Sequence, residues 1–77
     1  MSLRKSQSSL YIFQRLLEDG SIKRNEIISI LSISDVTFRR YIQEIRAYLV
    51  NFNEPYEITY IKTEDTYYLK KLHGYQK

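Results

Sequence analysis

Side chains that can hydrogen-bond to the edges of DNA bases recur at helical spacing in the middle of this chain. Arginine can bond bidentately to guanine and glutamine to adenine, while a small apolar group can contact the methyl of thymine. Hydroxyl groups can hold the phosphate backbone. The segment 34–49 offers such groups at Ser34, Val36, Thr37, Arg39, Arg40 and Gln43. These residue types predict a surface that reads double-stranded DNA, provided that one helix places them on one side.

A helix over 34–49 would place them in this way. Ser34 can cap its N-terminus, and Asp35 complements the positive end of its dipole. Four apolar residues share one buried stripe of this helix, because they are spaced by four, three and four: Phe38, Ile42, Ile45 and Leu49. The opposite side carries Val36, Arg40, Gln43 and Ala47, flanked by Thr37 and Arg39. For one helix alone, solvated surface charge is the commoner explanation of two neighbouring arginines, and the preceding segment is what favours DNA reading.

The first helix is predicted from Ser8 or Ser9 to about Glu18, since either serine can cap it. Gly20 follows and can take the left-handed conformation that ends a helix. The apolar face of this helix is expected to be Leu10, Phe13, Leu16 and Leu17. The polar and basic residues 1–8 are expected to form a flexible arm.

A second, shorter helix precedes the segment described first. An extended link over 21–23 leads into it, and it runs from about Arg24 to Leu31. It is apolar over much of its circumference, so we expect it to lie between other elements. Residues 32–34 form the tight turn before the third helix, which is expected to end near Val50.

The pattern changes to that of a β-hairpin in the last third of the chain. Residues 57–62 and 66–70 are rich in β-branched and aromatic side chains, and the polar turn 63–65 separates them. The order helix, link, helix, turn, helix and hairpin predicts one α+β domain over 9–72. Residues 73–77 are expected to be a tail or linker.

The charge of the chain is unevenly distributed. The 77 residues carry 12 Lys or Arg and 9 Asp or Glu, for a net charge of +3. The first fifty residues hold eight basic and five acidic side chains, and the remainder hold four of each. The basic excess therefore lies in the helical half, as contact with phosphate would require. Without cysteine, a signal peptide or a long apolar run, we expect a cytoplasmic protein with no membrane partner.

Three helices with a short turn between the second and third, followed by a hairpin, resemble a winged helix-turn-helix. The local motif consists of Ser34, two variable residues, Thr37, Phe38 and two arginines. This motif resembles the start of the recognition helix in the N-terminal DNA-binding domain of bacterial DeoR-type repressors. It is also similar to the N-terminal winged helix of WYL-domain regulators, which often end the wing in a tyrosine-rich strand like residues 66–69. Mga- and BglG-like regulators are a weaker match.

The resemblance implies that the chain binds double-stranded DNA as part of a bacterial transcription regulator, with the third helix in the major groove. It implies that Ser34 caps the helix and contacts a phosphate, and that Thr37 contacts the DNA backbone. Arg39 and Arg40 would serve phosphates and base edges. One helix reads few base pairs, so we expect a homodimer to supply useful specificity.

Several positions extend the pattern or depart from it. Lys23 and Arg24 stand at the start of the second helix, where we expect them to clamp phosphate. Tyr41 follows the second arginine, where these regulators commonly have aspartate. Ile28 replaces a small residue of the second helix, and Ser32 stands where glycine is frequent. These departures affect the geometry with which the third helix would dock.

The predicted wing tip, residues 63–66, carries two acids and no base. A tip pressed against phosphates usually carries Lys or Arg, because neutralising phosphates releases counterions. We therefore expect that this tip does not enter the minor groove. It is either solvated, or directed at a protein, or simply a polar turn that serves the hairpin. The acidic tip and the eight tyrosines also permit an alternative, a winged helix that acts as a protein-interaction module, and RNA binding ranks third.

Catalysis finds little support in the sequence. The single histidine, His73, lies near the C-terminus and is more typical of a solvated tail than of a general base. The acidic pairs 18–19 and 64–65 are adjacent residues, which point in different directions on a helix. No convergent set of metal ligands and no glycine-rich phosphate loop is visible. We expect neither an enzyme nor a cofactor.

Overall fold

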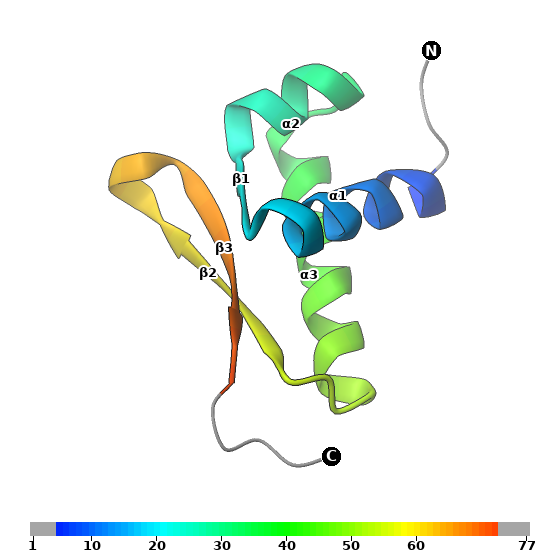
Figure 1. Ribbon diagram of the computed structural model, residues 1–77. Helices are drawn as coiled ribbons and strands as arrows, with labels where there is room; N and C mark the ends of the chain where they lie inside the picture. Colours follow the sequence, from blue (N-terminus) through cyan, green and yellow to red (C-terminus); the bar gives the residue numbers. More distant parts are fainter. Residues whose placement is uncertain (1–4, 73–77) are drawn as a thin grey trace.

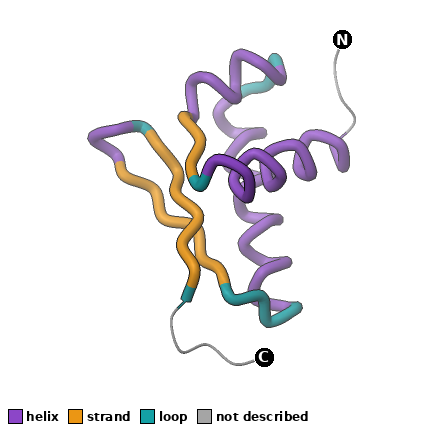
Figure 2. The backbone as a smooth tube through the Cα atoms, viewed as in Figure 1, coloured by secondary structure: helices purple, strands orange, loops and turns teal. Residues whose placement is uncertain are grey.

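Residues 5–72, the part of the chain that the computed structural model describes, form three helices and a three-stranded antiparallel sheet (Figure 1). The elements are α1 (Lys5–Asp19), β1 (Ser21–Lys23), α2 (Arg24–Leu31), α3 (Asp35–Asn51), β2 (Tyr56–Ile61), the 3-10 turn η1 (Lys62–Glu64) and β3 (Thr66–Lys71). The prediction of an α+β fold is confirmed, and the element order is compatible with a winged helix. The sheet lies along one side of the helices (Figure 2).

The sheet has one strand more than the sequence predicted. Residues 21–23, expected to be a link, form β1 and pair with β3, so that the strand order is β1-β3-β2. Ile22 stands opposite Tyr67 in this pairing and is only 4% exposed. A segment of three residues is too short to show the alternation of apolar and polar side chains that predicts a strand. Burial of one isoleucine and pairing with a strand far along the chain determine its conformation.

The first helix differs from the prediction at its start and on its buried face. It begins at Lys5, so the expected arm over residues 1–8 is wrong for its second half. Ser8 is buried, and with Ile12 and Leu16 it forms an i, i+4 row that packs into the core. Leu10, expected in the core, is 66% exposed, and Leu17, also expected there, is 50% exposed. Residues 1–4 and 73–77, the remainder of the expected arm and tail, lie outside the described residues.

The third helix agrees with the prediction in its cap and in its buried stripe. The backbone N–H of Thr37 donates to the hydroxyl of Ser34 at 3.1 Å, so Ser34 is the N-cap. All four predicted stripe residues are buried, together with a tyrosine that was not placed in the stripe: Phe38, Tyr41, Ile42, Ile45 and Leu49. α3 therefore presents one complete face to the core and leaves the other face outside.

The tight turn before α3 depends on Ser32, which takes the left-handed conformation with φ of 53°. Its backbone N–H donates to the carbonyls of Ile28 and Ser29, which ends α2. α2 buries Ile27 and Leu31 but leaves Ile30 52% exposed, so it is covered on one side only. The expectation that α2 lies between other elements is met on that side alone.

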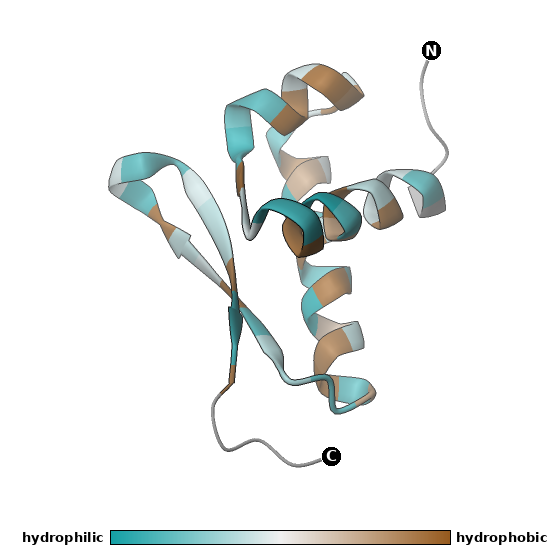
Figure 3. Cartoon of the chain, viewed as in Figure 1, coloured by the Kyte–Doolittle hydropathy of each residue, from teal (hydrophilic) through white to brown (hydrophobic). Residues whose placement is uncertain are grey.

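The core lies where α1 and α3 cross and where the sheet closes the space beside them. Aromatic side chains link the layers: the rings of Phe38 on α3 and Tyr67 on β3 are 5.3 Å apart in an edge-to-face arrangement. In Figure 3 the apolar stretches fall mainly on the helices, whereas the end of the β2–β3 hairpin is hydrophilic. We call residues 62–65 the hairpin tip.

Candidate nucleic-acid interface

The face of α3 opposite its buried stripe is open to solvent. Val36 is 64% exposed, and Arg40, Gln43 and Ala47 are exposed as well. A shallow hollow on this face is lined by Val36, Arg39, Arg40 and Gln43. The structure therefore brings together, on one helix face, the side chains that the sequence assigned to base reading.

Two of these side chains have their donors available. Within residues 5–72, neither Arg40 nor Gln43 makes a hydrogen bond or an ion pair with another side chain. A guanidinium with five N–H donors and an amide with both donor and acceptor groups thus stand on the outer face of a helix. This is the chemistry needed for bidentate contacts to guanine and adenine in a major groove.

Arg39, next to them, is held by an acid one turn earlier. Its Nε lies 3.0 Å and its Nη2 2.8 Å from Oδ2 of Asp35. The other oxygen of the same carboxylate, Oδ1, accepts from Nη1 of Arg24 at 3.0 Å. Arg39 is 65% exposed in its side chain, so the ion pair orients the guanidinium without removing it from solvent.

The start of α3 offers hydroxyl groups. Ser34 donates from its hydroxyl to Oγ1 of Thr37 at 3.0 Å, while its oxygen accepts the backbone N–H that caps the helix. The hydroxyl of Thr37 accepts in this contact and donates to no other group among residues 5–72. Of these two residues, Thr37 is therefore the better placed to donate to a phosphate at this end of α3.

A further arginine lies on the same helix flank as Arg39. Arg46, exposed, stands two turns after it and donates from Nη2 to the carbonyl of Ile58 on β2 at 3.2 Å. The spacing of seven residues between Arg39 and Arg46 is the sequence signal that places both on one flank of a helix. Arg39, Arg40 and Arg46 form a row of cations along α3, which we call the arginine row.

Arg24 is placed differently from the expected phosphate clamp. Its Nε donates to Oδ1 of Asp65 at 2.7 Å and its Nη1 to Asp35, so two of its guanidinium nitrogens are engaged with carboxylates. Its backbone N–H donates to the carbonyl of Asp65 at 3.0 Å. Arg24 therefore joins the hairpin tip to the starts of α2 and α3. The sequence could not show this, because nothing in the spacing relates Arg24 to Asp65.

Asp65, one of the two acids of the hairpin tip, thus faces inward. Asp65 has φ of 52°, a left-handed conformation that aspartate tolerates better than most residues. Its Oδ1 also accepts from the hydroxyl of Tyr60 at 2.7 Å. The three roles that the sequence left open for this tip did not include a contact between Asp65 and another element of the fold. Asp65 is an internal partner that meets the N-terminal end of α2, where Lys23 provides no side-chain cap.

The titration of these groups reflects the same contacts. The hydrogen bond from Arg24 lowers the pKa of Asp65 below its ordinary value, and the Tyr60 hydroxyl and the backbone N–H of Asn25 act in the same direction. The hydrogen bond to Asp65 raises the pKa of Arg24 above its already high value and raises the pKa of Tyr60. Asp65 thus stays ionised to a lower pH than an ordinary aspartate.

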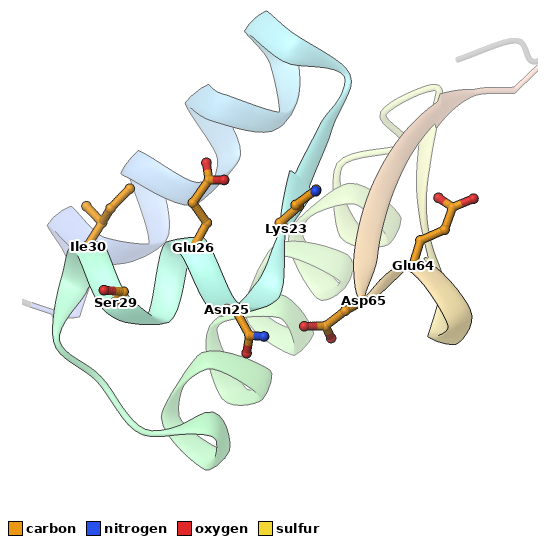
Figure 4. Close-up of a pocket in the computed structure, with 7 residues that line it drawn as sticks. All are labelled: Lys23, Asn25, Glu26, Ser29, Ile30, Glu64 and Asp65. Carbon is orange, nitrogen blue, oxygen red and sulfur yellow. The ribbon is translucent and has the colours of Figure 1, made fainter.

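Lys23 lies in a hollow between α2 and the hairpin tip (Figure 4). Three carboxylates line the same hollow, those of Glu26, Glu64 and Asp65. Glu64 in addition accepts from the hydroxyl of Tyr68. The structure therefore separates the two residues expected to clamp phosphate together: Lys23 stands among acids, and Arg24 is bound to two of them.

A second surface feature lies on the other flank of α3, toward α1. An apolar groove is lined by Ser9, Leu10, Phe13, Glu44, Ile45 and Tyr48. The rings of Phe13 and Tyr48 meet edge to face, with their centroids 6.1 Å apart. The ring centroid of Tyr48 is 4.9 Å from that of Phe52, which is 62% exposed. Among residues 5–72, the aromatic side chains that are exposed are those of Tyr48 and Phe52.

Comparisons with known protein families, with curated proteins and with solved structures found no match. Within residues 5–72, no helix combines the length and the apolar character needed to cross a membrane. The surface of the described residues combines an open helix face, a row of arginines beside it and an acid-lined hollow away from it.

Proposed function

We propose that this chain is a winged helix-turn-helix domain that binds double-stranded DNA, with α3 as its recognition helix. The observation that carries the proposal is the outer face of α3, where Arg40 and Gln43 stand exposed with no partner among residues 5–72. Arginines that serve only solubility need no fixed orientation. The guanidinium of Arg39, next to Arg40, is oriented by Asp35. Together the three groups offer base-edge donors and phosphate contacts on one helix.

The fold supports the same proposal. α2 and α3 are joined by a turn whose left-handed residue is Ser32, and the hairpin follows α3 directly, as a wing would. In the proposed complex Val36, Arg40 and Gln43 face base edges. Thr37 and Arg39 contact the backbone, and Ser34 caps the helix that carries them. Such a domain would be the DNA-reading part of a bacterial transcription regulator of the DeoR or WYL type.

The wing of the proposed complex stays out of the minor groove. Asp65 is engaged inside the fold with Arg24 and Tyr60, and Glu64 with Tyr68. With two carboxylates at the tip, an approach to phosphates would be repulsive. We therefore assign the DNA contact to α3 and not to the hairpin.

The proposal includes a homodimer, because one recognition helix on one half-site reads too few bases. A second copy is assigned to the apolar groove between α1 and α3. This groove lies on the flank of α3 opposite to Arg39 and Arg46, so a two-fold contact there leaves the arginine row free for DNA. Leu10 and Phe52, both well exposed, would be covered by such a contact.

The test is a titration of the purified chain with a duplex of random sequence at about 50 mM and about 200 mM salt. Binding that weakens steeply with salt supports the proposal, and the slope counts the phosphates contacted. Selection from a randomised duplex pool then identifies the preferred site. A folded chain that does not bind at the lower salt concentration would overturn the DNA-binding proposal.

A second candidate, a protein-interaction module, is favoured by the apolar groove alone. It differs from the first in what substitution of the groove would do. Replacing exposed Leu10 of the groove by serine would abolish the interaction of a protein-binding module. A DNA-binding domain would lose its homodimer contact but would still bind a single half-site through α3. The salt titration decides between them first.

A further inference from the structure

A continuous set of polar contacts runs from the hairpin to the outer face of α3. The Tyr60 hydroxyl donates to Asp65, and Asp65 accepts from Arg24. Arg24 donates to Asp35, and Asp35 accepts from Arg39. Four of these residues are charged, and their charges sum to zero. We call the five residues the Asp35 network.

The carboxylate of Asp35 is the centre of this network. Its two oxygens are divided between two guanidinium groups, Arg24 at Oδ1 and Arg39 at Oδ2. Because Arg24 is itself anchored by the side chain and the backbone carbonyl of Asp65, Asp35 is held from the side of the hairpin. Arg39 is therefore bound to an acid whose own position is fixed, unlike an ordinary i, i+4 pair on a helix surface.

The contact restricts the side chain of Arg39 in a defined manner. Nε and Nη2 both face Oδ2 of Asp35, which leaves the Nη1 edge of the guanidinium for an outside partner. A long side chain that is fixed before binding loses less conformational entropy when it binds. The carboxylate beside it also offsets part of its charge, so Arg39 gains orientation at the expense of general attraction to phosphate.

We propose that Asp35 is a positioning residue for sequence discrimination: it orients Arg39, whose backbone contact fixes the register at which Arg40 and Gln43 meet base edges. This inference rests on the proposed DNA binding. Asp35 then lowers the affinity for random DNA and increases the difference in affinity between the preferred site and other sequences. The N-cap role belongs to Ser34, so capping does not account for Asp35.

The experiment compares the wild type with Asp35→Asn, which keeps the shape of the side chain and removes its charge. The probes are the duplex enriched from a randomised pool by the wild type and a duplex of scrambled sequence with the same composition. For Asp35→Asn we expect unchanged or tighter binding to the scrambled duplex and a ratio between the two duplexes that falls by about tenfold. An unchanged ratio would overturn the inference.

Asp19→Asn is the matched control. Asp19 accepts from Arg15 at 3.1 Å as an i, i+4 pair on α1, so its replacement alters the net charge of the chain by the same amount. We expect Asp19→Asn to leave the ratio between the two duplexes unchanged. An equal fall in both variants would mean that net charge alone is responsible, and the inference would be wrong.

A double-mutant cycle distinguishes positioning from a structural role. If Asp35 acts through Arg39, then Asp35→Asn introduced into an Arg39→Ala chain should not lower the ratio further. A further fall of similar size in that background would overturn the inference, because Asp35 would then act by another route. The NMR signal of the Arg39 Nε–H, expected to be sharp in the wild type and lost in Asp35→Asn, reports the same contact without DNA.

The outcomes also separate this inference from the proposed function. A wild-type chain that binds neither duplex at low salt overturns both. A wild-type chain that binds and discriminates, beside an Asp35→Asn chain that discriminates equally well, overturns only the role of Asp35. The proposal that α3 reads DNA would then stand without it.

Discussion

The outer face of α3 and the hairpin tip both carry charged side chains, and the structure uses the two sets in opposite directions. On α3, Arg40 is exposed and has no partner within residues 5–72. At the hairpin tip, Asp65 turns inward to Arg24, a residue 41 positions earlier in the chain. The first set is available to a ligand, whereas the second set holds the fold together.

The difference shows what decides the role of a surface charge. The faces of α3 follow from spacing within a single helix. Apolar side chains that recur every three or four residues lie on one side, and that side is buried. The role of Asp65 depends on which element folds over it. An acid at a wing tip would repel phosphate if it were free, but as a partner of Arg24 it positions the hairpin against α2.

The largest expected effect concerns the buried side of α3. Phe38 is fully buried against Tyr67, so Phe38→Ala should lower the free energy of unfolding by ~3–5 kcal/mol through lost burial and the cavity it leaves. Urea unfolding measures this loss. The control is Val36→Ala on the exposed side of the same helix, which should change stability by no more than ~0.5 kcal/mol. Similar losses for the two variants would show that the faces of α3 are wrongly assigned.

The next effect concerns the outer side of the same helix. Arg40→Ala should weaken binding to the preferred duplex by ~1–3 kcal/mol and relax discrimination at one position, if the guanidinium reads a base edge. Its stability should stay near that of the wild type. Arg15→Ala removes the same charge from α1 and is the matched control. A loss of affinity that is equal for every sequence would instead make Arg40 a phosphate contact.

Features of the fold that depend on local spacing could be predicted from the sequence, and features that depend on contacts between distant segments could not. The cap at Ser34, the stripe from Phe38 to Leu49 and the hairpin could be predicted, because each depends on local spacing or turn chemistry. The strand β1 and the buried face of α1 could not, since pairing with β3 and crossing with α3 are contacts between distant segments. A helix with apolar residues on more than one face, as α1 has at Leu10 and Leu17, permits two choices of buried side.

In the candidate site, too, placement on one helix could be predicted, whereas contacts with another element could not. The exposure of Arg40 and Gln43 could be predicted, because it depends only on their positions along one helix. The placement of Arg24 and that of Asp65 could not be predicted, because each is determined by the other. An arginine at the start of a helix and an acid in a turn are both common, and only folding brings these two together.

A pH titration tests the inward-facing acid. Because the folded-state pKa of Asp65 is lowered, its contribution to stability is present above the pKa of the unfolded chain and is lost as the pH falls through the folded-state pKa. Asp65→Asn should therefore destabilise the chain at neutral pH and make its stability less dependent on pH below about 4. Thermal unfolding across the acidic range measures both effects. An unaltered profile for Asp65→Asn would contradict the assigned role.

The smallest effect is expected where a lysine lies beside the acids of the hairpin tip. Every phosphate neutralised by a basic side chain adds about 0.9 to the slope of log affinity against log salt, so Lys23→Ala would lower that slope by about one if Lys23 clamped a phosphate. We expect no measurable change, because Glu26, Glu64 and Asp65 line the hollow that holds Lys23 and would repel a phosphate approaching it. Arg39→Ala, in the arginine row, should lower the slope in the same titration and shows that the measurement can detect a single contact. A fall of about one for Lys23→Ala would mean that DNA passes over this hollow, and the division between an outward-facing α3 and an inward-facing hairpin tip would then have to be redrawn with the start of α2 on the DNA side.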